Sequence, residues 1–240
     1  MKKKLFLSIP LLAFVVLLSS FLQNERITGN GDVKQEDRQA ATFRNIGTSG
    51  TFKVYITQGN THSIRIEAES NLLPYIETKL DGDDLEVRVK KGYNIKPTKD
   101  VNVYVTLQEV RELAASGSGG FYSKTKLKTD KLELAVSGSA EADLDVSSQQ
   151  MEVGVSGVSK VKLKGSATKA EYSISGKADI YAFDFQSDDV EIAISGSGNA
   201  SVNAQKTLDI AVSGMGNIKY KGNPQIKQSV SGMGKIAKEG

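Results

Sequence analysis

The sequence predicts an all-β protein whose larger part is a parallel β-helix, or β-solenoid, of about seven short coils. A period of roughly 19 residues is too short for two helices and a turn but suits one solenoid coil. Apolar and polar residues also alternate on both sides of each repeated pair, as is typical of strands. The repeat is a Ser-Gly pair that recurs once in every such period, and its serines are Ser116, Ser137, Ser156, Ser175, Ser195, Ser213 and Ser231.

Residues 1–20 are predicted to be a signal peptide that directs export. Three lysines follow Met1, and a largely apolar run then extends over positions 5–18, which is the pattern of such a leader. The run is shorter than the ~20 residues that span a bilayer, and Pro10 interrupts it, so a permanent anchor is the less favoured alternative. We expect a mature protein without an integral membrane span, located in the periplasm, on the outer-membrane surface or outside the cell.

The composition excludes several classes of site. The leader carries three lysines and no acid, so the formal net charge of +3 belongs to it, and the mature chain lacks the positive field of a nucleic-acid binder. The absence of cysteine rules out disulfides, thiol catalysis and cysteine-based zinc sites. The single histidine, His62, is predicted to be an exposed turn residue, and we expect no cofactor and no metal ion.

The chain before the repeats divides into two parts. Residues 21–41 are polar, with Val33 as an isolated apolar residue, and we interpret them as a lead-in segment. Residues 42–109 alternate with period two and predict a β-rich N-terminal part. This part can continue the solenoid as further, irregular coils or close its end as a cap. Its strands are expected at residues 52–57, 63–67, 85–89 and 101–105, with turns at residues 58–60 and 81–82.

Residues 110–240 are predicted to form the β-helix of Ser-Gly repeats. Leu107, Val110, Arg111 and Ala114 would also fit one stripe of a short helix at its start. The alignment of the repeats favours a strand instead, because Leu113 falls in one column with strand residues of the later coils.

Aligning the repeats on their serines places apolar residues in inward-facing columns. One residue before each serine stand Ala115, Val136, Val155, Ile174, Ile194, Val212 and Val230. Three residues before it stand Leu113, Leu134, Val153, Tyr172, Ile192 and Ile210, and five residues after it stand Phe121, Ala142, Val161, Ile180, Ala200, Ile218 and Ile236. Each coil therefore has two inward-facing strands. The Ser-Gly pair is the corner between them, where glycine allows a positive φ and the serine hydroxyl can bond a backbone group.

Several short motifs extend over nearly the whole mature chain. They are Gly29-Asn30-Gly31 with Val33, Glu36 and Arg38, then Phe43, Ile46 and Gly50, residues 52–59, Asn71-Leu72-Leu73, residues 116–119 at the start of the repeats, and residues 214–220 and 231–236. Together they resemble the head GIN domain family, a group of exported bacterial proteins labelled autotransporter adhesins. The resemblance implies a β-helical fold, export and an adhesive role, and it supplies no catalytic residues to carry over.

An acidic column is predicted on the outside of the solenoid. Carboxylates about 5 Å apart repel by about 1 kcal/mol per pair in water, so screening, spread rotamers, nearby lysines or a bound cation must relieve the column. We interpret it as a solvated face and expect no metal, since carboxylates alone rarely supply the oxygens that calcium prefers. The column lies four residues before each serine and contains Glu112, Glu133, Glu152, Glu171, Glu191 and Asp209, followed by Lys227 in the last coil.

A column of small residues lies beside the acidic one and is the first candidate for a docking face. An outward strand face made only of small side chains is unusual, because larger residues such as threonine and lysine would suit an exposed strand position better. It can receive the chain's own N-terminal part, a second copy or another partner, or it can have no specific role. The column lies two residues before each serine and contains Ala114, Ala135, Gly154, Ser173, Ala193, Ala211 and Ser229.

Three aromatic residues, Tyr181, Phe183 and Phe185, are a second candidate contact site. Strand alternation with Ile180 and Ala182 inside directs all three outward, where they could stack on sugars or fill a partner's pocket. A one-residue bulge would turn them inward instead. Four acids also gather near them, which raises the alternative of a polysaccharide-cleaving carboxylate pair; these are Asp179, Asp184, Asp188 and Asp189.

The sequence favours a non-catalytic, adhesin-like surface protein that presents its β-helix faces to a glycan or protein partner. A polysaccharide-active β-helical enzyme and a purely structural envelope component are the alternatives. A homo-oligomer remains open, because flat repeated faces can pair with themselves. The family label rests on an analogy of fold, so the partner has to be argued from the surface itself.

Overall fold

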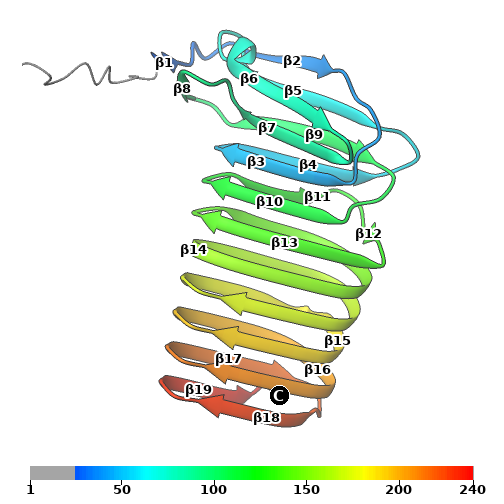
Figure 1. The fold of residues 1–240 in the computed structure, drawn as a ribbon, viewed down its shortest axis with the longest axis vertical. Helices are drawn as coiled ribbons and strands as arrows, with labels where there is room; N and C mark the ends of the chain where they lie inside the picture. The colour runs from blue at the N-terminus through cyan, green and yellow to red at the C-terminus, as the bar shows by residue number, and fades with distance from the viewer. Residues whose placement is uncertain (1–24, 240) are drawn as a thin grey trace, which may run out of the picture.

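The structure, a computed structural model, describes residues 25–239, so the predicted signal peptide lies outside the described residues. These residues form a flattened, parallel β-solenoid of about six turns (Figure 1). The prediction of an all-β solenoid is confirmed, with about six turns where about seven were expected. The only helical structure described is a single 3₁₀ turn, η1 (Leu73–Tyr75), and the alternative of a short helix near residue 110 is not formed.

The repeat part forms two sheets joined by corners. Its strands β14, β15 and β16 run unbroken around the edge opposite the Ser-Gly corners (Figure 1). All neighbouring coils pair in parallel. The strands are β10 (Glu112–Gly117), β11 (Gly120–Ser123), β12 (Leu127–Lys128), β13 (Lys131–Gly138), β14 (Glu141–Ile174), β15 (Lys177–Ile194), β16 (Ser197–Val212), β17 (Met215–Lys221), β18 (Gln225–Val230) and β19 (Met233–Lys238).

The predicted columns are confirmed by the strand register and by burial. Ser137 lies opposite Ser156, and Val136 opposite Val155. Further along, Ile174 lies opposite Ile194 and Ile194 opposite Val212. Five residues of this column, Val136, Val155, Ile174, Ile194 and Val212, are each no more than 3% exposed, and Ala115 is 5% exposed. Val230, in the last coil, is the exception at 41%. Full burial of such side chains contributes about 1.5–3 kcal/mol each, so the shared interior is the main source of stability.

Glycine is required at the corners chiefly because neighbouring coils approach so closely. A Cβ on Gly117, Gly138, Gly157, Gly176, Gly196, Gly214 or Gly232 would overlap the backbone carbonyl of the glycine one coil earlier. We expected positive φ to be the reason, and it applies to Gly117, Gly138 and Gly157. The later corner glycines have no such angle, so there the contact between backbones alone excludes a side chain.

The N-terminal part supplies both extra coils and a cap. Strands β3 (Asn45–Gly50) and β4 (Phe52–Gln58) pair in parallel with β10 and β11 on one side and with β7 (Asp84–Val89) and β9 (Val101–Leu107) on the other. The first coil of this part therefore lies between its second coil and the repeats. Ser49-Gly50 stands in register with Ser116-Gly117, so it is an eighth corner that the sequence alignment missed.

Antiparallel strands close this end of the solenoid. Strand β6 (Ile76–Asp81) pairs with β7, and β5 (Ser63–Glu69) pairs with β9. Strand β2 (Val33–Arg38) adds to β5, and β1 (Glu25–Thr28) pairs separately with β8 (Tyr93–Lys96). The segment we interpreted as a polar lead-in therefore contributes two strands, because backbone pairing at an edge does not require an apolar pattern.

Candidate functional site

All residues of the predicted small-residue column line one groove on the outside of the first sheet. The groove has a volume of about 900 Å³ and runs from Gly47 in the N-terminal coil to Ser229 in the last coil. Gly47 stands in register with Ala114, so the N-terminal part lengthens the column by one row. We call this feature the small-residue groove. Its column consists of Gly47, Ala114, Ala135, Gly154, Ser173, Ala193, Ala211 and Ser229.

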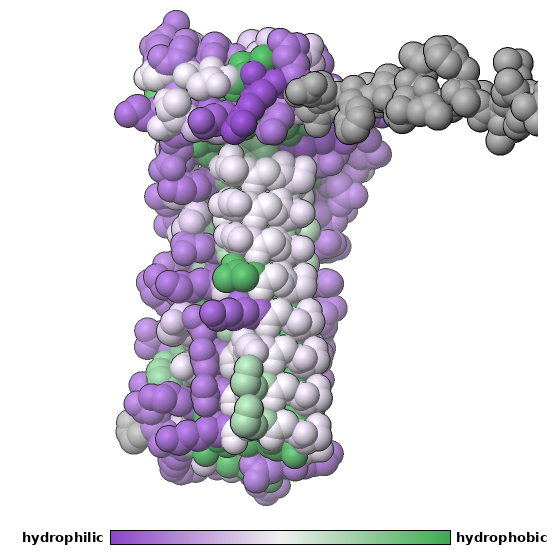
Figure 2. Space-filling view, turned by 90° about the vertical axis from the view of Figure 1, so that its left-hand side faces the viewer, coloured by the Kyte–Doolittle hydropathy of each residue, from purple (hydrophilic) through white to green (hydrophobic). Residues whose placement is uncertain are grey.

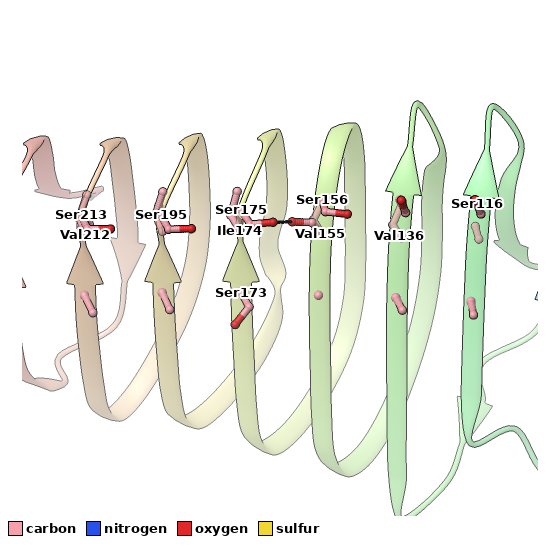
Figure 3. Close-up of a pocket in the computed structure, with 18 of the residues that line it drawn as sticks. Ser116, Val136, Val155, Ser156, Ser173, Ile174, Ser175, Ser195, Val212 and Ser213 are labelled. Atoms are coloured by element: carbon pink, nitrogen blue, oxygen red, sulfur yellow. Dashed lines mark hydrogen bonds between the residues drawn. The ribbon is translucent and has the colours of Figure 1, made fainter. Parts of the chain in front are cut away.

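The corner serines form one wall of the groove. Figure 3 shows Ser116, Ser156, Ser175, Ser195 and Ser213 arranged in file along successive coils. The N–H of Ser175 donates to the carbonyl of Val155 at 2.9 Å, and its hydroxyl reaches the same oxygen at 3.5 Å. Figure 2 views the corner edge and shows a pale stripe, neither strongly polar nor apolar, that runs down the solenoid between hydrophilic flanks.

The acidic column forms the other flank, and lysines relieve its repulsion. Lys131 Nζ lies 2.7 Å from Glu152 Oε1, and Lys169 Nζ lies 2.6 Å from Glu171 Oε1 and 3.2 Å from Glu191 Oε1. These hydrogen bonds raise the pKa of both lysines above the ordinary value. Within residues 25–239, no cluster of three or more histidine or acidic side chains is placed to hold a metal ion.

The groove is not covered by the chain's own N-terminal part, which was one predicted occupant. That part stacks on the end of the solenoid and continues the column, because β3 pairs edge to edge with β10 and does not pack on the face of the sheet. The groove residues from Gly154 to Ser229 are exposed. Within the described chain, the small-residue groove is thus open to solvent.

The three aromatic residues do not form one outward surface. Tyr181 is 46% exposed, whereas Phe185 is only 1% exposed, so the outward prediction is wrong for Phe185. Phe183 is half-buried, with Lys221 Nζ 4.7 Å from its ring centre. The register of β14 against β15 shifts at this point, since Lys162 faces Tyr181 but Lys164 faces Asp184. This bulge restores the inward direction one residue later than simple alternation would.

The acids near these aromatic residues tie successive coils together. Asn199 Nδ2 donates to Asp179 Oδ1 at 2.7 Å, and Thr207 Oγ1 donates to Asp189 Oδ1 at 2.7 Å. Lys206 Nζ lies 2.9 Å from Asp188 Oδ2. Each of the three carboxylates thus contacts a residue of the following coil, and these contacts help to hold the two coils together.

A stack of three tyrosines on the second sheet was not anticipated. The ring of Tyr55 lies 5.3 Å from that of Tyr104 and 5.4 Å from that of Tyr122. Lys124 Nζ lies 4.2 Å from the Tyr55 ring centre. Residues 52–57 and 101–106 share the order apolar, polar, Val, Tyr, apolar, Thr, and this likeness is the signal that could have revealed the parallel stacking of β4 on β9.

A buried carboxylate, Glu69, holds the N-terminal segment in place and was also missed. It is 1% exposed and accepts hydrogen bonds from the N–H of Gly31 at 2.6 Å and from the N–H and hydroxyl of Thr98 at 2.8 and 2.6 Å. Burial by itself would raise the pKa of Glu69, but these hydrogen bonds outweigh it and lower the pKa below the ordinary value. A side chain at Gly29 would overlap the carboxylate, which accounts for glycine in the Gly29-Asn30-Gly31 motif.

Two further expectations concern His62 and the membrane. His62 is half-buried, not exposed, and its ring meets that of Phe43 edge to face at 5.4 Å. This contact gives it a packing role. Residues 25–239 contain no helix with the length and apolar character needed to cross a bilayer.

Several known proteins of similar sequence and fold are described as putative adhesins. The family model described as "Putative auto-transporter adhesin, head GIN domain" matches residues 42–224. A solved structure of a putative adhesin from Bacteroides fragilis NCTC 9343 shares 26% identity with a TM-score of 0.84, covering 89% of this chain and 100% of that one. None of the curated proteins compared with the chain matches it.

Two solved structures from Parabacteroides have the same fold. A putative adhesin from Parabacteroides merdae ATCC 43184 shares 24% identity with a TM-score of 0.70, covering 90% of this chain and 100% of that one. A structure from Parabacteroides distasonis ATCC 8503, described as a putative lipid binding protein, shares 25% identity with a TM-score of 0.72 over the same fractions. The family match spans most of the chain and includes every row of the groove except the last, and the chain therefore belongs to the head GIN domain family of auto-transporter adhesin-like proteins.

Proposed function

We propose that the protein is exported and acts as a non-catalytic, adhesin-like binding protein that presents the small-residue groove to a glycan or protein partner at the cell surface. The observation that carries this proposal is the unbroken column from Gly47 to Ser229, in which eight successive rows hold no side chain larger than serine. Such a column leaves a straight trough into which a partner's sugar rings or side chains can protrude.

The rigidity of the solenoid favours binding of this kind. The rows of the groove belong to parallel ladders, and the inner residues of all coils but the last are packed in one core. A surface that is ordered before binding loses little conformational entropy when a partner docks. The exposed serine hydroxyls on one wall can donate and accept hydrogen bonds, as polar partners require.

Blocking the groove tests the proposal. Ala193→Arg places a long side chain across the middle of the exposed column, and we expect it to abolish binding of the labelled protein to intact bacterial cells and to glycan arrays. Ser201→Arg is the matched control, because Ser201 points outward from the second sheet, opposite Tyr181 in register. Equal binding by both variants, with unchanged thermal unfolding, would show that the partner does not use the groove.

A lipid chain is a second candidate occupant. Besides serine, the commonest residue of its lining, the groove is lined by alanine, glycine, valine and isoleucine, and the related protein from Parabacteroides distasonis is described as a putative lipid binding protein. Displacement of a fluorescent fatty acid by lipid, with loss of the signal in Ala193→Arg, would support this candidate over a glycan. Release of reducing sugars from polysaccharides would instead support the enzymatic alternative.

A further inference from the structure

Within the described residues, one edge of the last coil of the solenoid, formed by β18 and β19, is unpaired. Strand β18 pairs with β16, and β19 pairs with β17. Among residues 25–239, no strand lies on their other side. Figure 1 shows these two strands at one end of the stack, far from the antiparallel strands that close the N-terminal end.

The backbone groups on this free edge can be assigned from the ladder. The N–H of Ser231 donates to the carbonyl of Val212, and that of Ser213 donates to the carbonyl of Ile194, each at 2.8 Å. Since the backbone groups of alternate residues in a parallel strand point to opposite neighbours, Lys227 and Ser229 bond to β16. The N–H and C=O groups of Ile226, Gln228 and Val230 therefore face the free edge.

The inward-facing apolar residues of the last coil are also partly exposed to solvent. Ile226 and Val230 are 42% and 41% exposed, whereas Leu208 and Val212, which hold the same places one coil earlier, are 0% and 2% exposed. An added strand with apolar residues at these two places would complete the core as each earlier coil does. Burying such side chains would supply most of the affinity.

The charge of the outward columns changes sign in the last coil. Lys227 stands in the column that holds Glu191 and Asp209 in the two preceding coils. Lys235 follows Asn217 in a column of the second sheet. No ion pair joins Lys227 to Asp209 in the described chain, so its charge is free for a partner. Two copies meeting end to end would bring these lysines together, and edge lysines oppose such pairing.

We propose that the free edge of β18 is a docking site for an extended segment of a partner protein, one that carries an acidic residue between two apolar residues and adds as a further parallel strand. The backbone hydrogen bonds to Ile226, Gln228 and Val230 supply the pairing, and the acidic residue opposite Lys227 sets the register. This site lies on the end of the solenoid and is separate from the small-residue groove.

A peptide taken from the chain itself is a suitable probe. Residues 188–195 form an acidic strand in which Val190, Glu191 and Ile194 hold the places of Ile226, Lys227 and Val230 two coils earlier. We expect this peptide, with blocked ends, to shift and protect the amide signals of Ile226, Gln228 and Val230 in nuclear magnetic resonance spectra of the protein. Shifts confined to the groove residues, or no shifts at all, would overturn the proposal.

Two variants test the charge and the backbone separately. Lys227→Glu should weaken peptide binding by about fivefold or more, and a peptide carrying Glu191→Lys should recover binding to this variant. Lys177→Glu, an exposed change in the middle of the solenoid, should have no effect. Gln228→Pro removes one N–H from the free edge without removing a bond to β16, and we expect it to abolish binding.

Light scattering decides between a partner strand and a second copy. We expect the protein to stay monomeric at the concentrations used for the peptide titration. A dimer that Gln228→Pro dissociates would show that a second copy occupies the edge and would reject the proposal. Equal peptide affinity for the unmodified protein and Lys227→Glu would also reject it, because the charge would then play no part.

Discussion

At the scale of single residues, the corner glycines are where a small change should have the largest effect. A Cβ at Gly196 would overlap the carbonyl of Gly176 in the neighbouring coil. That carbonyl accepts a hydrogen bond from the N–H of Ser197 at 2.9 Å, so the two backbones cannot move apart freely. We predict that Gly196→Ala destabilises the protein by about 1–3 kcal/mol, the usual cost of overpacking. Thermal unfolding should show this as a melting temperature lower by about 2–4 °C per kcal/mol.

Gly154 provides the matched control for this prediction. It lies in the small-residue groove, has no positive φ, and a Cβ there would have no neighbouring atom within 4 Å. Gly154→Ala should therefore leave the melting temperature unchanged or raise it slightly, since glycine inside a strand is itself unfavourable. Similar losses in both variants would contradict the idea that contact between coils selects the corner glycines.

The buried Glu69 gives a prediction on pH. Its pKa in the folded protein lies below the ordinary value of 4.5, so the stabilisation it provides is complete above that pH and is lost as the pH falls through the folded-state pKa. Glu69→Gln should cost about 1–3 kcal/mol at pH 7. The gap between the melting temperatures of the two proteins should narrow as the pH falls below 4.5 and through the folded-state pKa of Glu69. A gap that keeps its full size until the protein unfolds in acid would mean that the charge of Glu69 does not matter.

At the scale of elements, strand alternation predicts the faces of most strands but not the bulge in β15. Ile180 and Ala182 face inward as expected, and two outward residues, Phe183 and Asp184, follow them before Phe185 turns inward. A bulge adds one residue without changing composition, so period two alone gives no sign of where it occurs. The bulge breaks the regular alternation of the strand, and burial of the large Phe185 ring in the core compensates for the lost regularity.

This bulge leads to a prediction about two neighbouring aromatic residues. Phe185→Ala should destabilise the protein by about 3–5 kcal/mol, because it empties a fully buried site. Tyr181→Ala should change stability by no more than about 0.5 kcal/mol, since Tyr181 is 46% exposed. Urea unfolding of both variants measures the difference. Comparable losses would place both rings in the core and would argue against the register shift.

At the scale of the whole molecule, the repeats were predictable because each coil contacts its immediate neighbours at a fixed spacing. Once Ser137 is aligned with Ser156, the core file and the small-residue groove follow directly. The coils of the N-terminal part do not follow one another at a fixed spacing in the sequence. Ser49-Gly50 pairs with Ser116-Gly117 across an insertion that contains β7 and β9, and a gap several times longer than one coil does not stand out as part of the short repeat.

The two ends of the solenoid also differ in a way that should govern how it unfolds. Antiparallel strands cover the N-terminal end, whereas within residues 25–239 β18 and β19 have a neighbour on one side only. In a one-dimensional array, the unit with a single interface opens first. Lys227 and Ser229 hold the same places as Glu191 and Ala193 two coils earlier. Their amides, which bond to β16, should therefore exchange with deuterium about tenfold faster or more than those of Glu191 and Ala193 under native conditions. Equal exchange at all four positions would mean that the solenoid opens only as a single unit and that its open end is no weaker than its middle.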